Sequence, residues 1–310
     1  MVTIFGCSTA DRQQPKKEQT FKIDEKRFAC GPPMGWNSWN SLGFQVNEKD
    51  VGKAANYMAE NLLKYGWNYI VIDAGWYFPE SVKTNDNHKP TPPVNIDPFG
   101  RLIPDTIKFP SAKGGKGFKP LADALHEKGL KLGIHIMRGI PWRAAQKNLP
   151  IFNSEYKARQ CSFIENTCSW STLNYRLNLE HSGSEAYYRS IINLYAEWGI
   201  DYIKVDDISR PYRDKEIELL SGIIQEQENE ILLSLSPGPT PPEKYSHVAK
   251  QAQLWRISND VWDHWKFVSR NINLARKWQG KSLCGSWPDL DIMPLGKMRI
   301  YPFDEWVAGL

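Results

Sequence analysis

Short apolar segments alternate with amphipathic stretches along most of the chain, and this alternation restricts its fold more than any other feature. The apolar segments are rich in β-branched and aromatic residues, and the stretches between them have the apolar spacing of helices. Strands that are apolar on both faces and separated by helices predict a parallel sheet covered by those helices. The predicted strands are 34–36, 69–72, 130–136, 201–205, 231–235, 254–257 and 282–285, and the predicted helices include 50–64, 118–128, 184–198, 214–228 and 264–278.

Polar side chains follow the ends of these strands. Because the carboxyl ends of parallel strands meet on one face of a closed sheet, this pattern favours a (β/α)8 barrel with its site on that face. A doubly wound sheet concentrates function at a switch point instead, and no Gly-rich phosphate loop follows the first predicted strand. The strand-end residues are Asn37, Trp39, Asp73, His135, Asp206, Asp207, Ser236, Asp260, Trp287, Asp289 and Asp291.

We predict two parts for the chain, a polar N-terminal tail over residues 1–30 and a barrel over residues 31–310. Seven strands can be counted, and residues 301–310 have the pattern of an approach to a helix rather than of an eighth strand. A barrel without its last strand exposes two unpaired edges. We therefore expect the barrel to be truncated at its C-terminal side and to be a fragment of a longer chain.

The first residues and the charge balance bear on location and partners. An apolar residue and a small residue precede Cys7, and a polar segment follows, which resembles the end of a bacterial lipoprotein signal and predicts an extracytoplasmic protein with a lipid anchor. No apolar stretch is long enough for a membrane span. The 39 Lys and Arg against 35 Asp and Glu give no nucleic-acid footprint. Cys161 and Cys168 are spaced for a disulfide, although ordinary thiols fit equally well.

Two of the strand-end carboxylates suggest glycoside hydrolysis. Asp206 lies two residues after Lys204, so both point to the same face of their strand, and the lysine charge would keep the carboxylate ionised. Asp260 lies in a Trp-rich segment, the apolar setting that an acid/base residue requires. In retaining hydrolysis one carboxylate attacks the anomeric carbon and the other transfers the proton, so no metal or cofactor is expected. Aspartates that only cap the next helix are the alternative.

Six segments match one known family in order: PMGWNSWN (33–40), IDAGW (72–76), LGIH (132–135), KVD (204–206), RISND (256–260) and WPDLD (287–291). Together they resemble glycoside hydrolase family 27, the α-galactosidase and α-N-acetylgalactosaminidase family. The resemblance implies a (β/α)8 barrel, a retaining mechanism, Asp206 as nucleophile and Asp260 as acid/base. In family members a C-terminal β-sandwich, not seen in this sequence, follows the barrel. The sugar-binding residues implied are Trp39, Asp73, His135, Lys204, Ser236, Arg256 and, at the rim, Asp291.

The chain departs from the family at positions that decide the sugar. Ala74 stands where α-galactosidases have a second acid, and an alanine cannot hydrogen-bond the hydroxymethyl group of galactose. This favours a β-L-arabinopyranoside, which lacks that group. Ser236 replaces a larger Glu and leaves room for the 2-acetamido group of N-acetylgalactosamine, while His135 replaces a Tyr. The leading expectation is an exo-acting α-galactosidase, with these two sugars and a non-catalytic sugar-binding barrel as alternatives.

Overall fold

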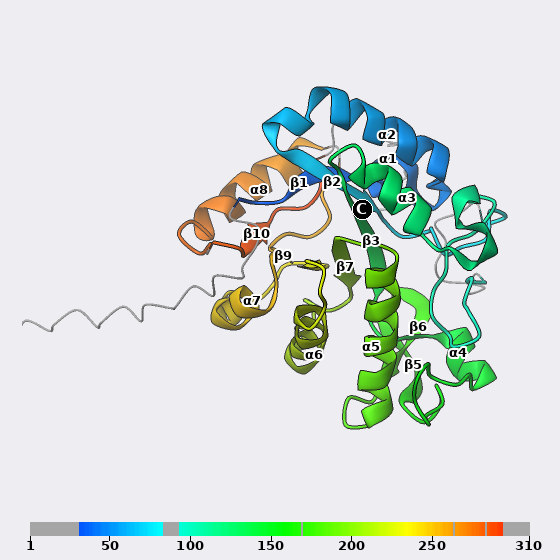
Figure 1. Ribbon diagram of the computed structural model, residues 1–310. Helices are drawn as coiled ribbons and strands as arrows, with labels where there is room; N and C mark the ends of the chain where they lie inside the picture. Colours follow the sequence, from blue (N-terminus) through cyan, green and yellow to red (C-terminus); the bar gives the residue numbers. More distant parts are fainter. Residues whose placement is uncertain (1–30, 83–92, 169, 263, 283, 294–310) are drawn as a thin grey trace, which may run out of the picture.

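Seven parallel strands form one curled sheet in the order β1-β2-β3-β7-β8-β9-β10 (Figure 1). This computed structural model describes residues 31–82, 93–168, 170–262, 264–282 and 284–293. Sheet neighbours along the chain are joined through helices, so the described residues form a partial (β/α)8 barrel, as predicted. The strands are β1 (Met34–Asn37), β2 (Trp67–Ile72), β3 (Lys131–Met137), β7 (Tyr202–Asp206), β8 (Leu232–Leu235), β9 (Leu254–Arg256) and β10 (Trp287–Asp289).

The helices pack around the outside of this sheet (Figure 1). In α2, Val51, Ala55 and Met58 recur at helical spacing and are buried, so one stripe of the helix faces the core. The helix begins after Asn47, whose side chain accepts a hydrogen bond from the backbone nitrogen of Asp50 at 3.0 Å. The helices are α1 (Trp39–Leu42), α2 (Glu48–Asn61), α3 (Lys119–His126), α4 (Trp142–Lys147), α5 (Ser182–Glu197), α6 (Asp214–Gln225), α7 (Tyr245–Gln251) and α8 (Trp265–Lys277).

The last strand lies later in the chain than the sequence predicts. The other six predicted strands overlap observed ones, but the prediction of a strand over 282–285 is wrong, because β10 starts at Trp287, which pairs with Leu254 of β9. Asp289 is therefore part of the strand and does not follow it. Pro288 lies in β10, which is an end strand of the described sheet. A proline is tolerated in such a strand because an end strand pairs with a neighbour on one side only and needs fewer N–H donors. Apolar content alone did not reveal this register.

The chain between β3 and α5 forms a small antiparallel sheet that the sequence analysis did not predict. It consists of β4 (Ile140–Pro141), β5 (Ser162–Cys168) and β6 (Ser171–Leu177), in the order β4-β6-β5. Cys161, just before β5, is a buried free thiol that donates to the carbonyl of Ala158 at 3.4 Å. A disulfide between Cys161 and Cys168 is therefore absent. The polar sequence of this hairpin hid its strands, because its pattern is that of a loop.

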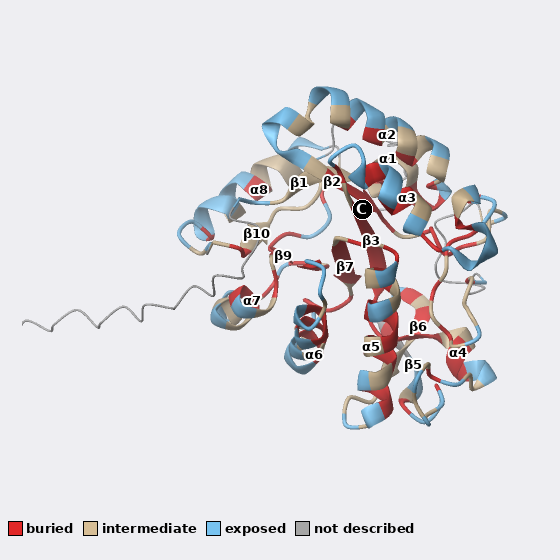
Figure 2. Ribbon diagram, viewed as in Figure 1, coloured by how far each residue is buried: buried red, intermediate tan, exposed pale blue. Residues whose placement is uncertain are grey.

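Apolar side chains cover both faces of the inner strands of the barrel sheet, and β3 and β7 are mostly buried, whereas the end strands β1 and β10 are half-buried (Figure 2). Ile70 and Ile72 of β2 face the helices, whereas Tyr69 and Val71 face the barrel interior with Tyr202 of β7. The rings of Tyr69 and Tyr202 lie 5.8 Å apart. Alternate residues of a strand therefore pack into two apolar layers, one against the helices and one inside the barrel. This explains why the strand sequences are continuously apolar.

The two ends of the chain lie outside the described residues. The predicted tail over residues 1–30, the proposed anchor at Cys7 and the segment expected to approach a helix at 301–310 all belong to these ends. Within the described residues, no helix has both the length and the apolar character needed to cross a membrane.

Gly35 of β1 tests how closely the first two strands approach. A Cβ at this position would lie 2.1 Å from the backbone oxygen of Tyr69. We predict that Gly35→Ala lowers the free energy of unfolding in urea by about 1–3 kcal/mol, because rigid backbone has to move. Gly52 of α2 has nothing within 4 Å of the added atom, and Gly52→Ala is expected to raise it by about 0.5–1 kcal/mol. Equal effects of the two substitutions would contradict the observed strand contact.

Candidate active site

Asp73 and Lys204 form a buried ion pair where β2 and β7 end. The amino group of Lys204 donates to Oδ2 of Asp73 at 2.8 Å, and Asn37 Nδ2 donates to the same oxygen at 2.7 Å. The backbone nitrogen of Asp73 donates to the hydroxyl of Ser38 at 2.9 Å. Burial acts to raise the pKa of Asp73, but the charge of Lys204 and these hydrogen bonds outweigh it and hold the pKa well below its usual range. Asp73 is therefore an ionised, fixed acceptor.

Asp206, the last residue of β7, is held through both carboxylate oxygens. Its Oδ2 lies 3.2 Å from Nε2 of His135 on β3, and its Oδ1 accepts from the backbone nitrogen of Asp207 at 3.0 Å. Burial acts to raise the pKa of Asp206, but the hydrogen bond from His135 and the charges of His135 and Lys204 lower it below 3.8. The side chain keeps 17% of its surface exposed. An ionised, accessible carboxylate suits a nucleophile.

His135 acts on Asp206 and is itself almost fully enclosed. Its ring is 2% exposed, and its backbone oxygen accepts a hydrogen bond from the indole nitrogen of Trp76 at 2.8 Å. The sequence predicts His135 as a sugar-binding residue, and the contact that the structure gives it is with the candidate nucleophile. The buried Tyr77 phenol lies near the same charges, since burial first, and then Asp73 and Asp206, raise its pKa well above the usual range.

Arg256, at the end of β9, joins the second candidate carboxylate to the rim. Its guanidinium contacts Oδ1 of Asp260 at 3.0 Å and Oδ1 of Asp291 at 2.8 Å. Asp260 is 56% exposed, so the prediction of an enclosed, apolar setting for this residue is wrong, whereas Arg256 is 2% exposed. The other oxygen of Asp291 accepts from the backbone nitrogen of Val261 at 2.7 Å. Asp291 therefore holds the loop that carries Asp260 through both Arg256 and the backbone.

The charge of Arg256 acts on three carboxylates, those of Asp260, Asp289 and Asp291. Burial raises the pKa of Asp291 to about 7, and the negative charges of Asp260 and Asp289 add to the effect against the opposing charges of Arg256 and Lys204. Burial acts to lower the pKa of Arg256, but the same carboxylates raise it, so the guanidinium stays charged. The group therefore binds a proton more readily than isolated carboxylates would.

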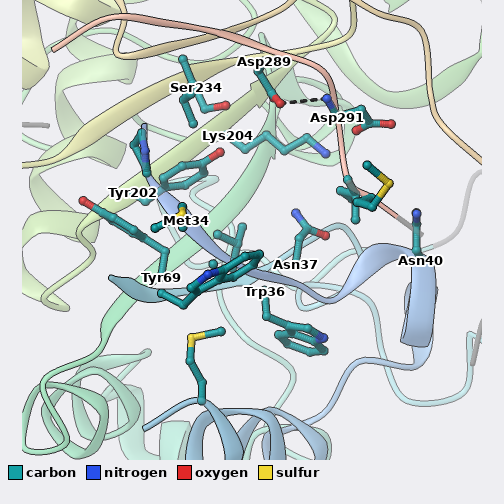
Figure 3. A pocket seen from close by; sticks show the side chains of 18 of the residues that line it. Met34, Trp36, Asn37, Asn40, Tyr69, Tyr202, Lys204, Ser234, Asp289 and Asp291 are labelled. Atoms are coloured by element: carbon teal, nitrogen blue, oxygen red, sulfur yellow. Dashed lines mark hydrogen bonds between the residues drawn. The ribbon is translucent and has the colours of Figure 1, made fainter. Parts of the chain in front are cut away.

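A cavity of about 600 Å³ adjoins this group between the end strands β1 and β10. Figure 3 shows Lys204 crossing its polar end, with the amino group toward Asn37 and Asp291 and the rings of Tyr69 and Tyr202 below. Asp206 and Asp260, which the structure describes, are not among the residues that line it. The cavity thus reaches Lys204, Arg256 and Asp291, three of the predicted sugar-binding residues, while the two candidate catalytic carboxylates lie outside it.

The remaining predicted sugar-binding residues also lie at strand ends. Trp39 begins α1 directly after β1 and its ring lies 5.3 Å from that of Phe44. Ser236 follows β8, is 2% exposed, and its hydroxyl lies 3.5 Å from the guanidinium of Arg256. No group of three or more His, Cys, Asp or Glu side chains in the described part of the chain is arranged to hold a metal ion.

The chain is similar to known proteins in sequence and in fold. No family model matches the chain. A β-L-arabinopyranosidase of family GH27 from Geobacillus stearothermophilus is 42% identical, with a TM-score of 0.83 over 87% of this chain and 63% of that one. A putative α-N-acetylgalactosaminidase from Bacillus halodurans is 44% identical, with a TM-score of 0.73 over 86% of this chain and 62% of that one. The chain belongs to glycoside hydrolase family 27.

The chain is also similar to curated α-galactosidases. The α-galactosidase of Oryza sativa is 25% identical over 86% of this chain and 51% of its own length. A probable α-galactosidase B of Penicillium simplicissimum is 31% identical over 68% of this chain and 36% of its own length. The chain spans about half the length of the α-galactosidases from Oryza sativa, Arabidopsis thaliana and Cyamopsis tetragonoloba that it matches.

The family 27 pattern did not reveal every residue that supports the site. The strand-end positions of Asn37 and Asp289 identify them as candidate site residues, but the sequence does not show which groups they contact. Asn37 donates a hydrogen bond to Asp73, and Asp289 accepts one from the backbone nitrogen of Asp291 at 2.8 Å. Tyr77 gave no signal, because a tyrosine in an apolar segment reads as core. Each of these contacts joins different strands or loops, and only the assembled barrel brings them together.

The proton on Asp291 predicts a pH dependence of stability. The unfolded chain releases this proton near pH 3.8 and the folded protein near pH 7, so the aspartate makes the fold less stable as pH rises through that interval. We predict that the unfolding free energy of Asp291→Asn, relative to wild type, increases from pH 4 to about pH 7. Asn61→Ala on α2, which replaces a side chain that carries no charge, is the control and should show no such trend. A constant difference for Asp291→Asn would refute the raised pKa.

Proposed function

We propose that the chain is the barrel of a retaining exo-glycosidase that releases a terminal pyranose with the ring configuration of galactose. The observation that carries the proposal is the state of Asp206, an ionised carboxylate at the end of a barrel strand, fixed through both oxygens and partly open to solvent. Membership of family 27 supports the same reading. The α-galactosidases among its relatives make terminal α-D-galactosides the first substrate to test.

The mechanism uses two carboxylates in turn. Asp206 attacks the anomeric carbon while protonated Asp260 gives its proton to the departing glycosidic oxygen, which leaves a covalent ester between sugar and Asp206. Asp260, now ionised, takes a proton from water, and the oxygen of that water attacks the anomeric carbon and releases Asp206. Two inversions at one carbon retain its configuration. The Arg256 contact with Asp260 keeps the acid on a defined side of the site.

The ring hydroxyls of the sugar have buried partners in this proposal. Lys204 and the ionised Asp73 present a donor and an acceptor already fixed by each other at 2.8 Å, so little freedom is lost on binding. Arg256 and Ser236 would serve the hydroxyl nearest the anomeric carbon. A site whose buried groups match the substrate hydroxyls rejects sugars that leave those groups unpaired.

A second candidate substrate, a β-L-arabinopyranoside, is favoured by one specific position. Ala74 directly follows Asp73 and presents only a methyl group at the position where α-galactosidases have a second acid. The neighbour with a TM-score of 0.83 is named a β-L-arabinopyranosidase, in agreement with this position. The small Ser236 is the corresponding argument for a 2-acetamido sugar, as the name of the Bacillus halodurans neighbour suggests. Nitrophenyl glycosides that differ only in these substituents separate the three.

The location of the protein is a separate proposal. The residues around Cys7 resemble the end of a lipoprotein signal, which supports an extracytoplasmic protein anchored by a lipid at that cysteine. These residues lie outside the described part of the chain. Oligosaccharides and glycoconjugates in the surroundings of the cell would then be the source of substrate.

Replacing the nucleophile tests the activity. We predict that Asp206→Asn lowers kcat on the best nitrophenyl glycoside by about 10³-fold or more, because an amide cannot form the ester intermediate. Asp123→Asn, far along α3, should leave kcat unchanged. Undiminished turnover by Asp206→Asn would reject the nucleophile. Sugar binding by a wild-type protein that hydrolyses none of the glycosides would instead favour a non-catalytic sugar-binding barrel.

Ala74 offers a test of the sugar itself. Ala74→Asp restores an acceptor for the hydroxymethyl group, so we predict that the ratio of kcat/KM for the α-D-galactoside to that for the β-L-arabinopyranoside rises by about tenfold. Ala74→Ser adds a smaller polar group and should change the ratio less. Steady-state kinetics on the two nitrophenyl glycosides measures both. A ratio that is unchanged or falls in Ala74→Asp would show that this position does not face the substituent.

A further inference from the structure

A buried ionic cluster supports the strand end that carries Asp206, and no step above uses it. We infer that Arg138 is a positioning residue for the nucleophile, which it holds through Asp207; this rests on the proposed function. The cluster consists of four side chains, each at most 4% exposed, and one backbone carbonyl. Its members, called here the Arg138 cluster, are Arg138, Asp207, Glu216, Tyr188 and the carbonyl of Thr167.

Arg138 uses every side of its guanidinium within this cluster. Its Nε donates to Oδ2 and to the backbone oxygen of Asp207, both at 2.8 Å. One terminal nitrogen donates to Glu216 of α6 at 3.0 Å, and the other donates to the carbonyl of Thr167 on β5 at 2.9 Å. The hydroxyl of Tyr188 on α5 also bonds to Glu216. A planar fork with five donors can make these contacts together, whereas an ammonium cannot.

Two residues of the Arg138 cluster form hydrogen bonds with Asp206 through their backbone nitrogens. The backbone nitrogen of Arg138 donates to the carbonyl of Asp206 at 3.1 Å. The backbone nitrogen of Asp207 donates to Oδ1 of Asp206 at 3.0 Å, and the Arg138 side chain holds Asp207 by its carboxylate and carbonyl. One oxygen of the nucleophile is therefore fixed by a backbone group whose position depends on Arg138.

Asp207 needs this support because of its backbone conformation. Its φ is +61°, in the left-handed region that residues other than glycine rarely adopt. Such a conformation is unfavourable for a residue with a Cβ, although less so for Asp than for most, and it persists where surrounding contacts enforce it. Here the contacts of Arg138 with Asp207 enforce it, and the result is an N–H directed at the Asp206 carboxylate. His135 holds the second oxygen, so both bonds together set the plane of the attacking group.

Arg138→Lys tests the inference with little change in charge. The lysine keeps the positive charge beside Asp207 and Glu216 but loses the fork. We expect kcat to fall by about 10- to 100-fold with KM changed less than about threefold, because a misplaced nucleophile slows chemistry more than binding. Arg101→Lys is the control, since Arg101 also pairs with an aspartate, Asp97, at 2.7 Å, in a contact that is largely but less completely buried. It should lower the melting temperature comparably and leave kcat unchanged.

Asp207→Asn provides an independent arm. Asn tolerates the left-handed conformation but lacks the charge that binds Arg138, so its kcat should fall in the same way. The double variant Arg138→Lys/Asp207→Asn should be no slower than the worse single variant, because both act through one contact. Should Arg138→Lys not fold, Asp207→Asn alone makes the same test.

The outcomes separate this inference from the proposed function. A wild-type protein active on a glycoside, with kcat unchanged in Arg138→Lys and Asp207→Asn, overturns the positioning role alone. Losses that multiply in the double variant overturn the shared route through Asp207. A wild-type protein without turnover on any glycoside overturns the proposed function and the positioning role with it. A fall in kcat at constant KM in both single variants, with the Arg101→Lys control active, supports it.

Discussion

The site depends on one buried cation, Lys204, placed between carboxylates of two strands. Burial alone would lower its pKa, but Asp73 and Asp206 raise the pKa above its usual range, so the charge persists inside the barrel. That charge keeps Asp73 ionised against its own burial, and it acts on Asp206 together with the hydrogen bond and charge of His135, which contribute more there. A buried ion pair of this kind contributes little net stability, and its value lies in the fixed positions of its members.

The same principle recurs at two neighbouring points of the barrel edge. Arg256 joins Asp260 and Asp291, and Arg138 joins Asp207 and Glu216, so each buried cation serves two carboxylates. In the Arg256 group burial raises the pKa of Asp291, and the negative charges around it add to that effect. In the Lys204 group the balance favours ionised carboxylates, which suits a nucleophile. Environment thus gives chemically identical side chains different roles.

The sequence predicts the barrel well because its main signal is local. Apolar runs and helical spacing identify six of the seven strands, and a polar residue after a strand identifies the site face. Local patterns fail where pairing decides the outcome. The register of β10 is set by Leu254 opposite Trp287, and the contacts of Arg138 with Asp207 and Glu216 join residues far apart in the chain. Such contacts exist only once the sheet and its helices have assembled.

The most direct test of the central claim is the identity of the residue that becomes bonded to sugar. A fluorinated galactosyl or arabinopyranosyl fluoride that forms the covalent intermediate quickly and hydrolyses slowly would trap it, and mass spectrometry of the digested protein would locate it. The account predicts the added mass of one fluorosugar on the peptide that contains Asp206, at the carboxylate of that residue. Rapid release of fluoride with no labelled peptide, or a label on any other residue, would contradict it.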